Sequence, residues 1–223
     1  MLRQVCTSVA VVLVCAATGA RAGTLTGTIH YTGEPPTRRP VPNVPTLCGA
    51  GPIYDESLVT GAGLANVVVY VDDAPVSSVA PAGVTVRQEG CAYVPHVQAA
   101  VVGSDLSIVN GDNVFHTAHG YAQDGSSVFN VATPGAGFSA TRKLDTPGPV
   151  HLKCDAGHTW MDATVFVLPH RFFAVTGPDG KFTIEGLEPG SYTVKTWHER
   201  LGERTTKVAL ARGHDGKVEL TYP

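Results

Sequence analysis

No long apolar run follows the first 22 residues of this 223-residue chain. Beyond that point no stretch reaches the roughly 20 consecutive apolar residues that a membrane-spanning helix needs. Clusters of Lys and Arg are also missing, and charged residues make up only 16% of the sequence. Since nucleic-acid binding depends on basic side chains that neutralise phosphates, the composition indicates neither a membrane span nor a nucleic-acid partner.

The sequence also lacks the common catalytic signatures. It contains no G-x-S-x-G nucleophile elbow, no H-E-x-x-H motif, no phosphate loop and no dinucleotide fingerprint. No pair of carboxylates stands out as a general acid and base. These absences predict that the protein is not an enzyme.

A long helical period is missing as well, whereas β-branched and alternating runs are frequent. Segments 24–31 and 64–71 are typical of strands, and turn signals at 33–36 and 72–75 separate them. Residues 35–52 hold six prolines and are expected to form an extended surface loop. The chain is therefore predicted to be all-β.

Residues 1–22 are predicted to be a secretory signal peptide. Arg3 precedes a short apolar run over 9–17, and Ala20, Arg21 and Ala22 form an A-x-A cleavage site. Cleavage leaves about 14 basic residues against 19 acidic ones, a net charge near −5. Where charge steers association, this balance favours a basic partner.

The chemistry concentrates in one stretch, 150–168, which reads VHLKCDAGHTWMDATVFVL. Cys154 shares a period-two spacing with apolar residues, so a strand here turns its thiol inward. His158 and Met161 follow at C-x3-H-x2-M spacing before a second β-branched run. A thiolate, an imidazole and a thioether on one loop favour copper over magnesium, calcium or manganese. The alternative is a buried structural cysteine beside an unrelated histidine and methionine.

A second imidazole would complete a His2Cys set with a weak methionine ligand. His116 supplies it; this residue follows a strand that ends in IVN at 108–110 and comes 38 residues before Cys154. It can meet Cys154 only if strands distant in sequence are brought together, as in a Greek-key sandwich. His119 and His96 stay open as ligands, although a strand would turn His116 and His119 to opposite faces.

Export leaves three cysteines: Cys48, Cys91 and Cys154. An odd number in an oxidising compartment indicates one disulfide and one free thiol. Because Cys154 is assigned to the metal, we predict a Cys48–Cys91 disulfide. The competing interpretation makes Cys48 or Cys91 a ligand, since Cys91 and His96 have C-x4-H spacing.

Several short motifs follow one another between residues 84 and 168. They are YVP at 93–95, GSDL at 103–106, IVN at 108–110, His116, Phe138, PGPV at 147–150 and the loop with Cys154, His158 and Met161. This segment resembles the plastocyanin-type cupredoxins, which implies a Greek-key cupredoxin sandwich that holds one type 1 copper.

The resemblance implies that His116, Cys154 and His158 are the equatorial ligands and Met161 the axial ligand. It further implies an electron-transfer surface formed by His158 with Trp160. The sequence departs from the family in two places. Thr117 stands where the family often has Asn, which alters the hydrogen bonds around the ligands. The gap of three residues between the ligands Cys154 and His158 differs from the common two or four. The resemblance therefore does not predict the reduction potential.

After residue 168 the pattern changes, with turns at 178–181 and 188–190 between alternating segments. This part resembles the carboxypeptidase regulatory-like, transthyretin-like domains, whose opening strands look like 27–33 and 64–71. We expect an immunoglobulin/transthyretin-like β-sandwich made of 23–83 and 169–223. The cupredoxin domain, 84–168, is then inserted into it. The whole arrangement is similar to periplasmic proteins of the methylamine utilisation type.

The resemblance implies a periplasmic, monomeric one-electron carrier whose partners are redox proteins such as a cytochrome, dehydrogenase or oxidase. A metal held by Cys, two His and Met keeps no open position for a substrate. A single cysteine in the loop excludes a binuclear purple centre, and the paired H-x-H motifs of multicopper oxidases are absent. Two alternatives remain: a copper-binding or trafficking protein, and a partner-binding module with structural copper.

Overall fold

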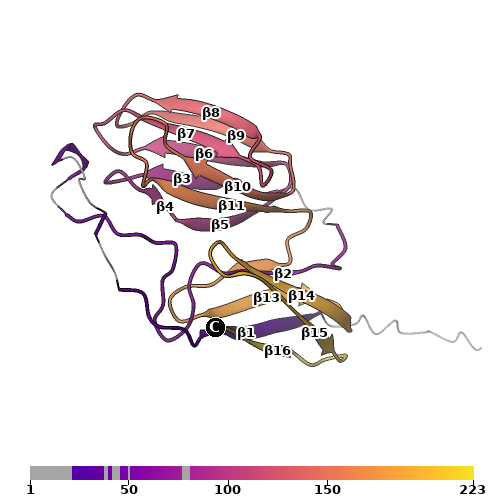
Figure 1. Ribbon diagram of the computed structural model, residues 1–223. Coiled ribbons are helices and arrows are strands. Elements are labelled where there is room, and N and C mark those ends of the chain that lie inside the picture. Colours follow the sequence, from indigo (N-terminus) through magenta and orange to yellow (C-terminus); the bar gives the residue numbers. More distant parts are fainter. Residues whose placement is uncertain (1–21, 38–39, 42–45, 50, 77–80) are drawn as a thin grey trace, which may run out of the picture.

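The computed structural model describes residues 22–37, 40–41, 46–49, 51–76 and 81–223 (Figure 1). The predicted signal peptide, apart from Ala22, lies outside the described residues. The described chain forms strands β1 to β16 and one 3-10 turn, η1 (Thr46–Cys48), which confirms the all-β prediction. Among these residues no helix has the length and apolar character needed to cross a membrane.

The strands build two sandwiches, one above the other in Figure 1. The central sandwich consists of a five-stranded sheet, β5-β11-β10-β7-β8, and a four-stranded sheet, β4-β3-β6-β9. Its strands are β3 (Val84–Gln88), β4 (Tyr93–Val94), β5 (Val97–Val101), β6 (Ser104–Asn110), β7 (His116–Tyr121), β8 (Ser127–Thr133), β9 (Ser139–Leu144), β10 (Gly148–Lys153) and β11 (Asp162–Leu168).

Strands distant in sequence are neighbours in the central sandwich. β3 pairs with β6 and β5 with β11 in parallel, whereas the other pairs are antiparallel. Parallel neighbours need a crossover, so the chain passes between the two sheets rather than folding as successive hairpins. This is the non-local arrangement that the Greek-key prediction required.

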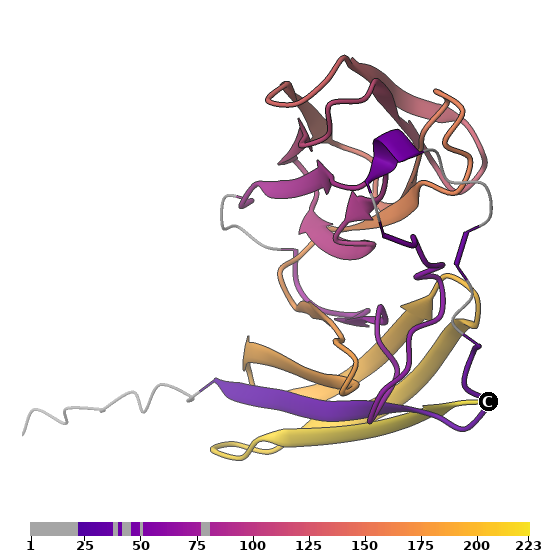
Figure 2. The same ribbon diagram turned by 90° about the vertical axis from the view of Figure 1, so that its left-hand side faces the viewer.

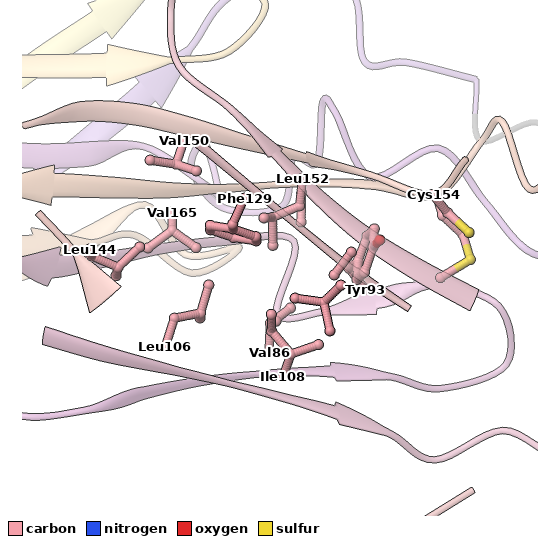
Figure 3. Close-up of a cluster of buried hydrophobic side chains, with 14 of the residues drawn as sticks. Val86, Tyr93, Leu106, Ile108, Phe129, Leu144, Val150, Leu152, Cys154 and Val165 are labelled. Carbon is pink, nitrogen blue, oxygen red and sulfur yellow. The ribbon is translucent and has the colours of Figure 1, made fainter. Parts of the chain in front are cut away.

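The core of the central sandwich follows from alternation along its strands. β6 buries every second side chain, Leu106 and Ile108 among them, and exposes or half-buries the others. Figure 3 shows these two residues facing Leu152 and Val165 of the opposite sheet, with Cys154 at one end of the cluster. Burial of each such side chain contributes about 1.5–3 kcal/mol. The thiol therefore lies where a rigid apolar core ends.

The terminal sandwich joins both ends of the described chain. Its sheets are β13-β1-β16 and β12-β2-β14-β15. The strands are β1 (Gly23–Tyr31), β2 (Val68–Val71), β12 (Phe173–Val175), β13 (Lys181–Leu187), β14 (Gly190–His198), β15 (Gly202–Leu210) and β16 (Gly216–Tyr222). β1 and β2 pair with strands beyond residue 168, while the nested arrangement and its boundaries at 84 and 168 stay a prediction.

Apolar contacts join the two sandwiches. Tyr70 of β2 packs against Phe166 of β11 with ring centroids 5.5 Å apart, and Trp197 of β14 lies 5.3 Å from the same phenylalanine ring. These rings belong to a separate buried cluster between the five-stranded sheet and the terminal sandwich. Because buried aromatic residues dominate such contacts, the two sandwiches pack as one body along this face.

A long irregular connection between β1 and β2 runs past both sandwiches. Figure 2 shows η1, within this connection, lying against the central sandwich. Cys48 at the end of η1 is bonded to Cys91, which precedes β4, so the predicted disulfide is confirmed. The bond rules out the alternative in which either cysteine offers a thiolate to a metal. The connection is thus covalently fixed beside the loop that carries His158.

Candidate metal centre

Three donor atoms from two separate segments, β7 and the loop between β10 and β11, converge at one end of the central sandwich. The Nδ1 atoms of His116 and His158 lie 3.2 Å apart, and Cys154 Sγ lies 3.9 Å and 3.7 Å from them. His116, Cys154 and His158 are all buried, at 0%, 5% and 6% exposure. The structure therefore brings together three of the four ligands that the sequence predicts.

Strand pairing explains why these residues meet. β7 begins at His116 and runs antiparallel to β10, with His119 opposite Lys153. One residue further on, Cys154 leaves β10 beside the beginning of β7, where the Thr117 N–H donates to Sγ at 3.4 Å. His158 then returns on the loop that connects β10 to β11. The five-stranded sheet positions His116, and the loop between β10 and β11 positions His158.

Met161 closes this loop. Its N–H donates to the His158 carbonyl at 2.9 Å, and its side chain is only 2% exposed. It belongs to the same buried cluster as Cys154. Gly157, with φ of +89°, supplies the left-handed position that the turn requires. The thioether is consequently inside the core at the end that holds the other three donors.

The surroundings favour the thiolate form of Cys154. Burial alone raises the pKa of this thiol, but hydrogen bonds from His116 and from the Thr117 and Ala156 N–H groups outweigh burial and lower the pKa to about 6. Burial lowers the pKa of His116, because it disfavours the charged imidazolium. The hydrogen bonds of His116 to Cys154 and Asp112 outweigh burial and raise this pKa overall. The thiolate, which is the metal-binding form of cysteine, is therefore available near neutral pH.

Thr117 braces the two ligand segments against each other. Its N–H reaches Cys154 Sγ, and its Oγ1 accepts a hydrogen bond of 2.7 Å from the Asp155 N–H. Thr117 thus links the segment of His116 to the loop of Cys154. The buried Tyr93 hydroxyl lies within hydrogen-bond distance of the Thr117 carbonyl and 3.1 Å from the Lys153 carbonyl. Sequence reasoning missed this role of Tyr93, because YVP entered only as one of the motifs of the cupredoxin resemblance.

Asp112 is a second residue that sequence reasoning missed. Its Oδ2 lies 3.0 Å from His116 Nε2, on the side of the ring away from Cys154. The same carboxylate accepts hydrogen bonds from the Gly90 and Cys91 N–H groups at 2.7 Å and 2.9 Å. The sequence NGDN at 110–113 indicated a loop, and the spacing of Asp112 four residues before His116 was its only signal.

His158 is covered rather than exposed. Its ring meets Trp160 edge-on at 5.4 Å, and the Trp160 Nε1–H donates to the Cys91 carbonyl at 3.0 Å. Both sulfurs of the disulfide lie within 4.8 Å of a His158 nitrogen. The electron-transfer surface at His158 and Trp160 stays a prediction, and the disulfide with its connection lies over this histidine.

The two histidines left open by the sequence lie outside the convergence of donors. His119 turns to the other face of β7, where Asp155 Oδ2 lies 2.7 Å from its Nδ1 and Ser127 Oγ lies 2.8 Å from its Nε2. His96 pairs with Glu199 of the terminal sandwich, and its Nδ1 lies 3.2 Å from the Asp162 carbonyl. Neither imidazole faces Cys154, so the described structure gives the thiol two histidine neighbours.

The chain is similar to several solved structures, at low identity. No family model matches the chain, and no curated protein matches it. Among solved structures, a purple cupredoxin from Nitrosopumilus maritimus is 18% identical, with 38% of this chain and 98% of that chain covered and a TM-score of 0.32. Amicyanin from Paracoccus versutus is 18% identical over 49% of this chain and 95% of that one, with a TM-score of 0.34.

A copper-containing nitrite reductase from Thermus scotoductus is 23% identical over 44% of this chain, with a TM-score of 0.33, and the match spans only 25% of the reductase. The topology and donor set described above, rather than these low scores, carry the assignment. They define the class of protein: a cupredoxin-like β-sandwich joined to a second β-sandwich.

Proposed function

We propose that the chain binds one copper ion through His116, Cys154 and His158, with Met161 as the axial ligand, and carries single electrons between periplasmic redox partners. The observation that carries this proposal is the convergence of two imidazole Nδ1 atoms on one buried thiol with a lowered pKa. Copper bound there would supply a reversible one-electron couple.

The donor set fits copper on chemical grounds. A thiolate, two imidazoles and a thioether are softer than the oxygen ligands that magnesium, calcium or manganese prefer. The two nitrogens and the sulfur lie about as far from one another as ligands around a single ion do. All four proposed donors come from buried side chains, which favours electron transfer over substrate binding. We therefore propose that the protein is an electron carrier rather than a catalyst.

The chain's own residues suit an electron carrier because they hold the donors in place. His116 and Cys154 are fixed at the ends of paired strands, and Thr117 ties both segments together. A site that changes little in geometry between oxidation states has little to reorganise during electron transfer. Cys154 is only 5% exposed and belongs to the apolar core, so little water reaches the thiol.

The partners that we propose are periplasmic redox proteins such as a cytochrome, dehydrogenase or oxidase. With the predicted signal peptide removed, the chain has more acidic than basic residues, so charge steering favours a partner with a basic docking face. Association with such a partner should weaken as salt is raised, since exposed charges are screened.

Visible and electron paramagnetic resonance spectra of the Cu(II)-loaded mature protein test this function. We expect an intense thiolate-to-copper band that Cys154→Ser abolishes. His119→Gln is the matched control, because it alters a histidine on the opposite face of β7 and should leave the band intact. Copper that stays bound through repeated reduction and oxidation supports a carrier, whereas release on reduction supports trafficking. Fully loaded protein without the band would refute the proposal.

A further inference from the structure

Asp112 contacts the copper ligand His116 from outside the metal site. Its Oδ2 lies 3.0 Å from His116 Nε2, while Nδ1 of the same ring faces Cys154 and His158. When Nδ1 of an imidazole binds a metal, the proton remains on Nε2, which then donates to its neighbour. That neighbour here is a carboxylate whose side chain is only 13% exposed.

The carboxylate is held in place independently of His116. The Gly90 N–H donates to Oδ1 and the Cys91 N–H donates to Oδ2, at 2.7 Å and 2.9 Å. Gly90 and Cys91 both have left-handed backbone angles, φ of +60° and +54°. Successive N–H groups in such a turn point at one anion and form a nest. The disulfide at Cys91 fixes this turn, so the position of Asp112 does not depend on the histidine.

We propose that Asp112 is the positioning residue of His116, and that its carboxylate makes the imidazole a stronger donor and thereby favours Cu(II) over Cu(I). This inference rests on the proposed copper site. A carboxylate that accepts the Nε2 proton fixes the ring orientation and raises the basicity of the coordinating nitrogen. Greater basicity stabilises the more highly charged ion, which lowers the reduction potential.

A purely structural role for Asp112 makes a different prediction. If the carboxylate only capped the Gly90–Cys91 turn, its loss would weaken the affinities for Cu(II) and Cu(I) equally. The ratio of the two affinities separates the roles, because only a change in donor strength acts more on one oxidation state. A general loss of stability cancels from this ratio.

The test is Asp112→Asn, with separate competition titrations for Cu(II) and Cu(I). Mutation of such an outer partner typically costs 10–100-fold in metal affinity. We expect a loss in that range for Cu(II) and one about tenfold smaller for Cu(I). A tenfold change in the ratio corresponds to a potential about 59 mV higher. Asp124→Asn is the matched control. It removes an aspartate that caps a turn at the far end of β7, at 2.9 Å from the Ser126 N–H, and should leave the ratio unchanged.

Nuclear magnetic resonance of the wild-type protein with Zn(II) at the site gives an independent readout. We expect a slowly exchanging Nε2–H signal from His116, and its absence would overturn the inference, as would an unchanged affinity ratio in Asp112→Asn. The signal does not depend on copper chemistry. Wild-type protein that shows this signal but no thiolate-to-copper band would refute the proposed function and leave the Asp112–His116 contact standing. Absence of the Nε2–H signal overturns the inference even where Asp112→Asn does not fold.

Discussion

Replacing Cys48 and Cys91 with alanine is expected to destabilise the protein by about 4 kcal/mol. The two residues are separated by 43 positions. In the chain-entropy model, opening a loop of that length returns about 4 kcal/mol of conformational freedom to the unfolded chain at 25 °C. For a protein of this size the loss corresponds to a fall in Tm of roughly 8–16 °C.

Chemical denaturation of the metal-free protein measures this effect, with reduced wild type as the matched control. Reduction breaks the same cross-link while both sulfur atoms stay in the core, so the two samples should lose similar stability. A loss below about 1 kcal/mol in both would show that packing, rather than the covalent bond, restrains the connection. Chemical labelling of His158 should rise in the same variant, because both sulfurs lie against this side chain.

Two further predictions concern the core and the junction between the sandwiches. Leu152→Ala should cost about 2–5 kcal/mol in denaturant unfolding, because Leu152 is fully buried between the sheets; a cost below about 1 kcal/mol contradicts this packing. Burial lowers the pKa of His96, but the hydrogen bond and charge of Glu199 outweigh burial and raise it above 6.5. The stabilisation from this pair is therefore complete below pH 6.5 and is lost as the pH rises through the folded pKa. Unfolding titrations should show the deficit of Glu199→Gln shrinking from about pH 5.5 to about pH 9, and a constant deficit argues against the pair.

The sequence predicted those features of the site that depend on local spacing. C-x3-H-x2-M between two strand-like runs identified Cys154, His158 and Met161 as neighbours, and cysteine parity predicted the disulfide. His116 was predicted because the His2Cys donor set needs a second imidazole. It could reach Cys154 only through pairing of strands that are distant in sequence. A donor set of thiolate, imidazole and thioether groups favours copper, and the geometry of a copper site in turn indicates which residue types supply the ligands.

The contacts around the donors were not predictable in the same way. Asp112 contacts His116 because the β6–β7 connection is hydrogen-bonded to the Gly90–Cys91 turn. The periodicity of the sequence does not predict this contact. Tyr93 braces Thr117 through its hydroxyl, which a strand pattern does not distinguish from a packed ring. Such interactions depend on tertiary geometry, so composition and spacing leave them open.

The terminal sandwich has a physical link to the metal loop. Asp162 follows Met161 directly and begins β11, and its carbonyl lies 3.2 Å from His96 Nδ1. The other nitrogen of the His96 ring pairs with Glu199, which follows β14 of the terminal sandwich. The His96 carbonyl also accepts from the Thr164 N–H at 2.8 Å, so two bonds hold the beginning of β11. Since Met161 precedes this anchored strand, the terminal sandwich helps to fix the end of the loop that carries Met161.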